Sequence, residues 1–187
     1  MSELRFKLTG VAPILLHSDR MSDPLDQMTK AMKKVSKRRT KTEEDHAEMA
    51  RLEWYGSLYV ENGRVVIPGE NIEAMLVAAA KKNRAGKQAQ VGLFCLENPV
   101  LIYDGPADID ALWEDGRFLF RCGACVGTSR VQRTRPRFDK WEVDVTVQFD
   151  PQEFNREDVI DLMIVAGQKI GLCDWRPKFG RFSVEVL

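Results

Sequence analysis

The sequence predicts an α+β fold, in which helices pack on one side of a mostly antiparallel sheet. Apolar residues alternate with polar ones, or run continuously, in several stretches that are typical of strands. Three other stretches carry apolar residues at helical spacing, and the last is followed by a loop and a closing strand. An Asn62-Gly63 pair between two short apolar runs is typical of a β-hairpin. A chain of 187 residues, 44% of them hydrophobic, can build one such domain with a sizeable insertion.

The first part of the chain predicts a long strand followed by a charged helical insertion. Residues 4–16 alternate loosely and then turn fully apolar, so we expect a strand with one buried end. Residues 18–26 are polar and contain an Asp-Pro pair, which favours a loop. Residues 26–54 are highly charged and carry apolar side chains at helical spacing near their start. Within them, residues 37–45 contain no apolar side chain, which indicates a solvated helix or a mobile segment.

The middle of the chain predicts a hairpin, a helix and a polar loop. Residues 57–60 and 64–67 form the two arms of the hairpin. The next helix begins near residue 69, and its apolar side chains share one face. Residues 84–90 are polar and predict a loop. The apolar face of the helix consists of Ile72, Met75, Leu76, Ala79 and Ala80.

Three further strands are expected at residues 99–103, 117–122 and 141–149. The basic stretch 128–138 lies between the last two and predicts a long loop, so that residues 117–149 form an extended hairpin.

A well-marked helix and a closing strand end the chain. Asn155, followed three residues later by Asp158, predicts the start of the helix. Gly171 predicts its end. Residues 181–187 then predict the closing strand.

The composition excludes several classes of protein. The formal net charge is zero, so the chain is not a polycation as a whole, although basic residues gather at 30–41 and 130–140. No apolar stretch approaches the length of a membrane span. The first residues lack the apolar core of a signal peptide. Four cysteines without a dense framework fit a reducing compartment, so we expect a cytoplasmic protein without membrane contact.

Two segments together carry a family resemblance. Residues 65–76 read Val-Val-Ile-Pro-Gly-Glu-Asn-Ile-Glu-Ala-Met-Leu, and residues 171–182 end in Phe-Gly-Arg-Phe. They resemble the strand, Ile-Pro-Gly and helix, and the closing glycine-rich loop and strand, of the RAMP superfamily. These are the RNA-binding proteins of CRISPR effector complexes. The Ala-Pro-Ile-Leu-Leu-His sequence at 12–17 lies where that family's opening strand ends.

The resemblance implies a ferredoxin-like (RRM-like) core and a single domain, 1–187, with the charged insertion at 26–54 and the extended hairpin at 117–149. The backbone subunits that line up along a guide RNA are the most similar members. A stand-alone relative carried by a mobile element, such as a phage, is the other form that the resemblance allows. The implied partners are RNA or single-stranded nucleic acid, bound largely without sequence preference. Further copies, or other CRISPR-type subunits, would lie side by side along that strand.

The residues expected to contact nucleic acid are cations and aromatic rings in three basic segments. Cations neutralise phosphates, and aromatic rings stack on bases. By the resemblance, the stretch 128–138 belongs to an extended hairpin, often called a thumb, that grips the strand. The alternative for each segment is a solvated surface without a ligand. The candidate residues are Lys34, Arg38, Arg39, Arg130, Arg133, Arg135, Arg137, Trp175, Arg176, Lys178, Phe179 and Arg181.

Candidates for catalysis and metal binding are weak. Some members of the resembled family cut RNA with an aspartate in the loop after the first strand, and Asp23 is nearest by position, with His17 close by. Turn chemistry before a proline is the alternative for Asp23. Cys122 and Cys125 have CxxC spacing, but zinc needs two more ligands, and inert buried thiols are the alternative. No cofactor is predicted.

Three hypotheses for the function follow. The first is a nucleic-acid-binding protein of the kind described above. The second is a protein-interaction module that mimics or blocks a CRISPR subunit. The third is an endoribonuclease of the RAMP type. The chain contains no phosphate-binding loop, nucleophile elbow or zinc-protease helix, so the sequence offers little support for a conventional enzyme.

Overall fold

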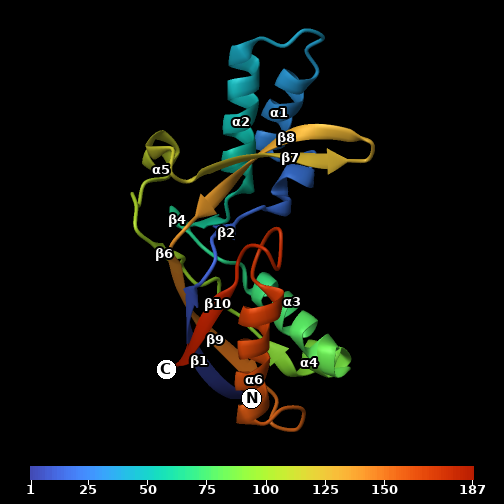
Figure 1. Cartoon of the computed structure of the whole chain (residues 1–187), viewed down its shortest axis with the longest axis vertical. Coiled ribbons are helices and arrows are strands. Elements are labelled where there is room, and N and C mark those ends of the chain that lie inside the picture. The colour runs from blue at the N-terminus through green and yellow to red at the C-terminus, as the bar shows by residue number, and fades with distance from the viewer. The chain divides into compact units, whose positions relative to one another are not determined.

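The computed structural model describes residues 1–187, apart from the side chains of Val126 and Ser129. Its contacts divide the chain into two compact units (Figure 1). Unit 1 contains residues 1–15, 60–105 and 138–187. Unit 2 contains residues 16–59 and 106–137. Unit 2 is therefore encoded by two stretches that interrupt the sequence of unit 1.

Unit 1 combines short and long strands with helices. Its strands are β1 (Ser2–Gly10), β2 (Ile14–Leu15), β3 (Val60–Glu61), β4 (Arg64–Val65), β5 (Leu93–Phe94), β6 (Ile102–Tyr103), β9 (Trp141–Phe149) and β10 (Phe182–Val186). Its helices are α3 (Gly69–Ala80), the 3-10 turn η2 (Lys81–Asn83), α4 (Gly86–Gly92), α6 (Arg156–Val165) and the π-helical turn η3 (Ala166–Ile170).

An antiparallel sheet in the order β10-β1-β9-β5 forms the centre of unit 1, and β6 also pairs with β9. Along β1 and β9 every second side chain is buried, because successive side chains of a strand point to opposite faces. The limits of β9 are those that the sequence predicts. The buried side chains are Leu4, Phe6 and Leu8 in β1 and Trp141, Val143, Val145, Val147 and Phe149 in β9.

Helices α3 and α6 contact each other and strands of this sheet (Figure 1). The predicted apolar face of α3 is buried throughout. Helix α6 begins at the predicted cap, since the side chains of Asn155 and Asp158 each accept a hydrogen bond from the backbone N–H of the other. It continues into η3 and ends at Gly171, whose φ is 79°. The α+β class with mostly antiparallel sheets is therefore confirmed.

The predicted hairpin is present as β3 and β4, although each arm is only two residues long. Asn62 has a φ of 51° and Gly63 a φ of 74°. Positive φ at both central residues is what a two-residue hairpin turn of this kind requires, and Asn-Gly supplies it with little strain.

Unit 2 contains a pair of helices, a hairpin and shorter elements. The helices α1 and α2 pack side by side (Figure 1). The elements are the 3-10 turn η1 (Asp19–Ser22), α1 (Gln27–Ser36), α2 (Glu43–Ser57), α5 (Ile109–Asp115), β7 (Leu119–Val126) and β8 (Ser129–Phe138), whose last residue lies in unit 1.

The prediction that residues 26–54 are helical is confirmed, as two helices with a turn between them. Asp26 caps α1 by accepting the N–H groups of Met28 and Thr29. Thr42 and Asp45 form a capping box at the start of α2. The apolar-free stretch 37–45 is thus not one helix, since only residues 43–45 are helical and belong to α2.

The core of unit 2 gathers around Trp54 of α2, which is fully buried. Its indole N–H donates a 2.9 Å hydrogen bond to the carbonyl oxygen of Phe118. The ring also packs edge-on against Trp113 of α5, with 5.5 Å between centroids. The two stretches of sequence that build unit 2 therefore meet in one apolar cluster.

Two predictions of local structure are wrong, and one helix was not predicted. Residues 84–90 form most of α4, not a loop, because Ala89 is buried and its polar neighbours remain on the surface. Residues 109–115 form α5, which was not predicted. The stretch 128–138 is mainly strand β8, paired with β7, and not a long loop. The extended hairpin therefore consists of β7 and β8, while β9 pairs with β1.

Within the part of the chain that the structure describes, no helix is both long and apolar enough to cross a membrane.

Candidate nucleic-acid interface

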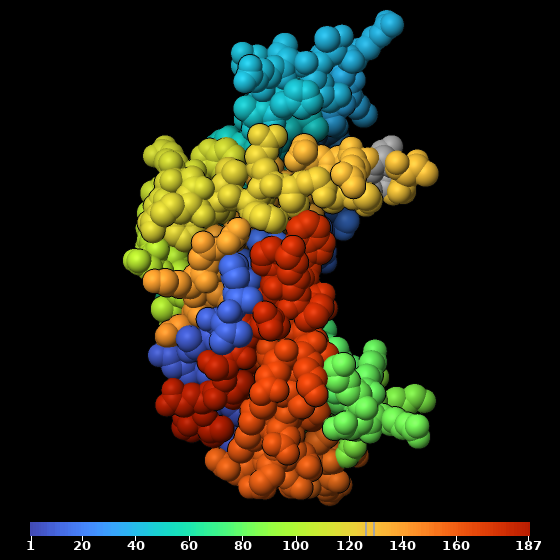
Figure 2. All heavy atoms as spheres, viewed as in Figure 1, coloured from blue at the N-terminus to red at the C-terminus, as the bar shows by residue number. Residues whose placement is uncertain are grey.

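The closing loop, residues 171–181, joins η3 to β10 in unit 1. The N–H of Leu172 donates a 2.9 Å hydrogen bond to the carbonyl oxygen of Gly180 and so ties the two ends together. Gly180 has a φ of 73°, and a Cβ at this position would lie 2.0 Å from the carbonyl oxygen of Leu172. Glycine is the residue that tolerates both the φ and the close approach. The loop lies on the surface of unit 1, in red tones in Figure 2.

Residues 11–15, which include β2, anchor this loop. The N–H of Gly180 donates to the carbonyl oxygen of Pro13 at 2.8 Å, and the N–H of Asp174 donates to that of Leu15 at 3.0 Å. The carbonyl oxygen of Arg181 accepts hydrogen bonds from Val11 and Ala12. The loop is therefore fixed before any ligand binds.

An aromatic pair and three cations lie on the closing loop. The rings of Trp175 and Phe179 stack with 6.0 Å between centroids and an angle of 13°. Phe179 is buried, whereas Trp175 is 44% exposed. Arg176, Lys178 and Arg181 are all exposed. The loop thus exposes the indole ring of Trp175, which packs on Phe179, beside cations that can pair with phosphates.

The two segments that carry the family resemblance are in contact. The side-chain N–H of Asn71, in the first turn of α3, donates to Sγ of Cys173 in the closing loop at 3.8 Å. Burial raises the pKa of the Cys173 thiol to about 12. The first turn of α3 packs closely against the backbone of Cys95, since a Cβ on Gly69 would lie 2.1 Å from the carbonyl oxygen of Cys95.

The open face of the main sheet is unsuited to RNA. RRM-type proteins stack bases on aromatic residues of this face. On β1, β9 and β10, the described side chains of this face include no aromatic ring. Acidic residues outnumber basic ones there, and Lys7 is paired with Glu142 at 2.8 Å. The charged residues of this face are Glu3, Arg5, Lys7, Glu142, Asp144 and Glu185.

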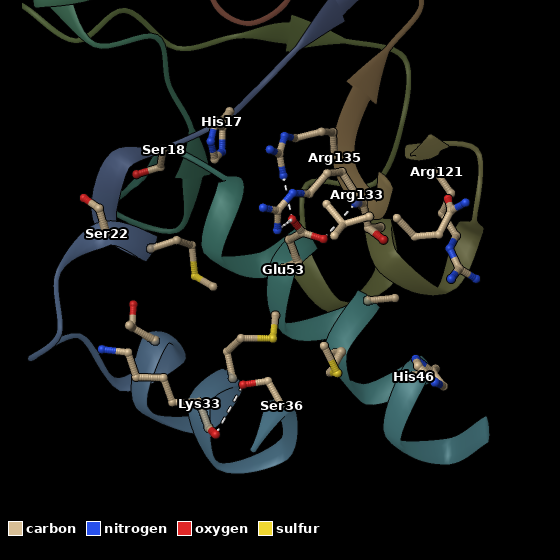
Figure 3. A pocket seen from close by; sticks show the side chains of 18 of the residues that line it. His17, Ser18, Ser22, Lys33, Ser36, His46, Glu53, Arg121, Arg133 and Arg135 are labelled. Atoms are coloured by element: carbon tan, nitrogen blue, oxygen red, sulfur yellow. Dashed lines mark hydrogen bonds and ion pairs between the residues drawn. The ribbon is translucent and has the colours of Figure 1, made fainter. Parts of the chain in front are cut away.

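In unit 2, Glu53 of α2 holds two of the candidate arginines (Figure 3). Nη1 of Arg133 donates to Oε1 of Glu53 at 3.1 Å, and Nη1 of Arg135 donates to the same oxygen at 3.0 Å. The backbone N–H of Thr134 donates to Oε2 at 2.9 Å. Arg135 is buried, with 10% of its side chain exposed. The side chain of Arg133 is 39% exposed and remains accessible.

The other candidate cations of unit 2 are mostly on the surface. Lys34, Arg39 and Arg130 are exposed. Arg38 is also exposed but is bonded to the buried carboxylate of Asp45. The guanidinium of Arg137 lies 5.5 Å from the centre of the Phe120 ring. The turn between α1 and α2 carries Arg38 and Arg39, and it is visible in light blue in Figure 2.

A cavity of about 910 Å³, here called the unit 2 cavity, opens beside Glu53. It is lined by η1, α1, α2 and the hairpin of β7 and β8 (Figure 3). Three methionines, Met21, Met32 and Met49, supply apolar surface. Lys33, Arg121, Arg133 and Arg135 supply positive charge. Both histidines of the chain also line it.

The two weak catalytic candidates differ in their setting. His17 lines the unit 2 cavity, whereas Asp23 does not. Oδ1 of Asp23 accepts the N–H of Leu25 at 2.8 Å, which is the turn chemistry expected of an aspartate before a proline. His17 and His46 lie at opposite sides of the cavity lining in Figure 3 and do not point toward one another.

Cys122 and Cys125 lie on the same strand, β7. Residues three apart on a strand point to opposite faces, so the two thiols do not face a common metal ion. In the described residues, no group of three or more metal-binding side chains comes together. The CxxC spacing is therefore a feature of an extended strand and not of a metal-binding loop.

Alkylation with iodoacetamide at pH 8 is expected to modify Cys125 first, because it is exposed. Burial raises the pKa of the Cys95 thiol to about 11 and that of Cys173 to about 12. At pH 8 roughly one thiol in a thousand, or fewer, would then be thiolate at either site. Peptide mapping by mass spectrometry measures each site, and unfolding in urea serves as the control, since it should expose both. Equal rates of alkylation at Cys125 and Cys173 in the folded protein would contradict the burial of the Cys173 thiol in the closing loop.

Sequence reasoning missed Glu53, the methionines and Asn71. Two arginines at 133 and 135, on one face of a strand, indicate that an acidic side chain lies nearby. The sequence does not tell which acidic residue this is. Met32 is one of the apolar side chains at helical spacing in residues 26–54, and the structure places it in the lining of a cavity.

No family model and no curated protein matches this chain.

Proposed function

We propose that the protein binds RNA or other single-stranded nucleic acid, largely without sequence preference. The observation that carries the proposal is the closing loop, where the exposed Trp175 stacks on the buried Phe179 beside exposed cations. Every nucleobase has a flat face, so a stacking surface of this kind accepts any base. Phosphates on either side of the stacked base would pair with Arg176, Lys178 or Arg181.

A second basic surface on unit 2 supports the same proposal. Lys34, Arg39 and Arg130 are exposed, and Arg133 is held in place by Glu53 while it remains accessible. These residues would bind phosphates through charge alone, which positions a strand but does not read its bases. Arg135 would act indirectly, by sharing the carboxylate that positions Arg133.

The finer fold assignment is part of this proposal. The order β10-β1-β9-β5, with α3 and α6 between strands in sequence, matches a β-α-β-β-α-β unit. We assign it to a ferredoxin-like core and, with the resemblance of residues 65–76 and 171–182, to a relative of the RAMP superfamily. The contact between Asn71 and Cys173 supports that relationship, since it joins the two segments.

Self-association would follow from the same assignment. Strand β10 ends the strand order, and Val11, Ile164 and Val184 line a hollow of about 540 Å³ beside it. An edge strand next to apolar side chains can receive a neighbouring chain. Light scattering with and without a bound 40-nucleotide RNA tests this, and one copy per strand at saturation argues against assembly.

Replacing Trp175 with alanine is expected to weaken binding of a fluorescent single strand by roughly 5- to 150-fold, because base stacking contributes about 1–3 kcal/mol. Trp175→Phe keeps an aromatic face and should recover most of the affinity. Fluorescence anisotropy with RNA and DNA of mixed sequence gives the dissociation constants. Equal affinities for Trp175→Ala and the parent chain would remove the observation on which the proposal rests.

Replacing Arg176 and Lys178 with glutamine is expected to reduce the slope of log K against log salt by about 0.7 for each lost phosphate contact. The matched control is Lys82→Gln, an exposed cation of η2 outside the loop. Binding that does not depend on salt contradicts the proposal.

Two other results favour the rival functions. If the chain binds no single strand but a protein co-purifies with it, a protein-interaction module is favoured. If the parent chain cuts RNA and the Asp23→Ala or His17→Ala variant leaves it intact, an endoribonuclease is favoured.

A further inference from the structure

The unit 2 cavity is enclosed by residues of one compact unit, so its shape is set by contacts within that unit. Its volume of about 910 Å³ falls in the range of sites for small molecules, on the order of 300–1,000 Å³. Five elements supply its lining, η1, α1, α2, β7 and β8, and Figure 3 shows side chains from them around a common space.

Methionine side chains give this cavity a soft apolar surface. Met21 comes from η1, Met32 from α1 and Met49 from α2. A Cβ on Gly56 would lie 2.1 Å from Sδ of Met21, so the bare backbone of α2 makes room for that side chain. Thioether sulfur packs favourably against aromatic rings and adapts to their shape. A flat heteroaromatic ring is therefore a suitable occupant.

The wall beside the methionines is positively charged. Arg133 and Arg135 share one carboxylate, that of Glu53, which leaves a net charge of about one on the three side chains. The bond to Glu53 uses Nη1 of Arg133, and 39% of that side chain is exposed. A guanidinium carries five N–H donors in a plane, and such a fork suits the oxygens of a phosphate. Lys33 of α1 and Arg121 of β7 add two exposed cations to the lining.

We propose that the unit 2 cavity binds a free nucleoside monophosphate, with the base against Met21, Met32 and Met49 and the phosphate on Arg133. The apolar and cationic parts of the lining match the two parts of this ligand. The inference goes beyond the proposed function because it concerns a monomer. It also involves none of the residues of the closing loop, which belongs to unit 1.

Isothermal titration of the full chain with AMP, GMP, CMP and UMP, in low salt, tests the proposal. We expect binding of one molecule per chain for at least the purine nucleotides, which have the larger rings. Inorganic phosphate alone and adenosine alone should each bind at least about tenfold more weakly than AMP, since each lacks half of the contacts.

Variants separate the two halves of the site. Arg133→Gln should weaken AMP binding by about tenfold or more, the effect of losing a charge-assisted hydrogen bond. Met32→Ala should weaken AMP binding while leaving the affinity for inorganic phosphate unchanged. Arg51→Gln is the matched control, because Arg51 is an exposed arginine of α2 in the same unit that does not line the cavity. Circular dichroism checks that each variant is folded. If Arg133→Gln does not fold, Met32→Ala still decides the question.

Three results overturn the inference. One is inorganic phosphate binding as tightly as AMP, which indicates a simple anion site. Another is the absence of nucleotide binding at millimolar concentration in a folded protein. The third is displacement of AMP by an acidic amphipathic peptide at a lower concentration than AMP itself, which indicates a protein partner. Unchanged binding of a long single strand, together with no binding of AMP, refutes this inference and leaves the proposed function intact.

Discussion

Replacing Glu53 with alanine is expected to lower the free energy of unfolding by about 3–5 kcal/mol, as breaking a buried ion pair from one side does. The side chains of Glu53 and Arg135 are 11% and 10% exposed. Without the carboxylate, the guanidinium of Arg135 is left buried without this partner. The backbone N–H of Thr134 also loses its 2.9 Å acceptor. Because α2 and β8 both belong to unit 2, the loss falls on that unit.

Urea unfolding followed by circular dichroism measures this effect. Glu48→Ala is the matched control on the same helix, since Glu48 forms only an exposed pair with Arg51, worth about 0–1 kcal/mol. Replacing Glu53 and Arg135 together with leucine and methionine should recover part of the loss, because the buried guanidinium is removed along with the carboxylate, and Arg133 is 39% exposed and can be solvated. Equal stability of Glu53→Ala and Glu48→Ala would show that the two arginines do not depend on this carboxylate.

Replacing Gly180 with alanine is expected to lower the free energy of unfolding by about 3 kcal/mol and to abolish strand binding by the closing loop. The added Cβ would lie 2.0 Å from the carbonyl oxygen of Leu172 and 2.7 Å from its nitrogen. These are backbone atoms, so a change of rotamer cannot relieve the clash. The hydrogen bond between Leu172 and Gly180 must break, and the support of Trp175 by Phe179 then changes.

Gly63→Ala separates the cost of the φ angle from the cost of the clash. Gly63 has a φ of 74°, close to that of Gly180, but a Cβ there meets no atom within 4 Å. Its substitution should cost only the left-handed conformation, roughly 1–2 kcal/mol. Strand affinity of Gly63→Ala should equal that of the parent chain. If Gly180→Ala and Gly63→Ala lower the free energy of unfolding equally, the close approach of Gly180 to the backbone of Leu172 is contradicted.

Elements marked by local signals could be predicted from the sequence. The capping pair of Asn155 and Asp158 and the glycine at 171 depend on neighbours a few residues away, and the structure has them as expected. The same holds for the turn at Asn62 and Gly63. Strand β9 was predicted with its limits because its apolar alternation is uninterrupted. In each case the residues that decide the structure lie within the element itself.

Elements that depend on distant partners could not be predicted in this way. Strand β8 carries arginines where an apolar alternation was sought, and it is stabilised by Glu53, about 80 residues earlier in sequence. Helix α5 is different, because Asp108 caps it and Gly116 ends it, and these local signals were missed in a short acidic stretch. For the candidate site, the residue types in the closing loop were predictable. The stacking of Trp175 on Phe179 was not, because it depends on the backbone conformation of the whole loop.

The order of strands in unit 1 has a consequence for synthesis of the chain on the ribosome. Strand β1 precedes every other strand, yet its two neighbours in the sheet, β9 and β10, come from the last third of the sequence. Phe6, for example, pairs with Val145 on one side and Val186 on the other. At about 5–20 residues per second, the apolar face of β1 would wait roughly 10–40 seconds for these partners. A nascent chain of this protein is therefore a natural client for chaperones that shield unpaired strands.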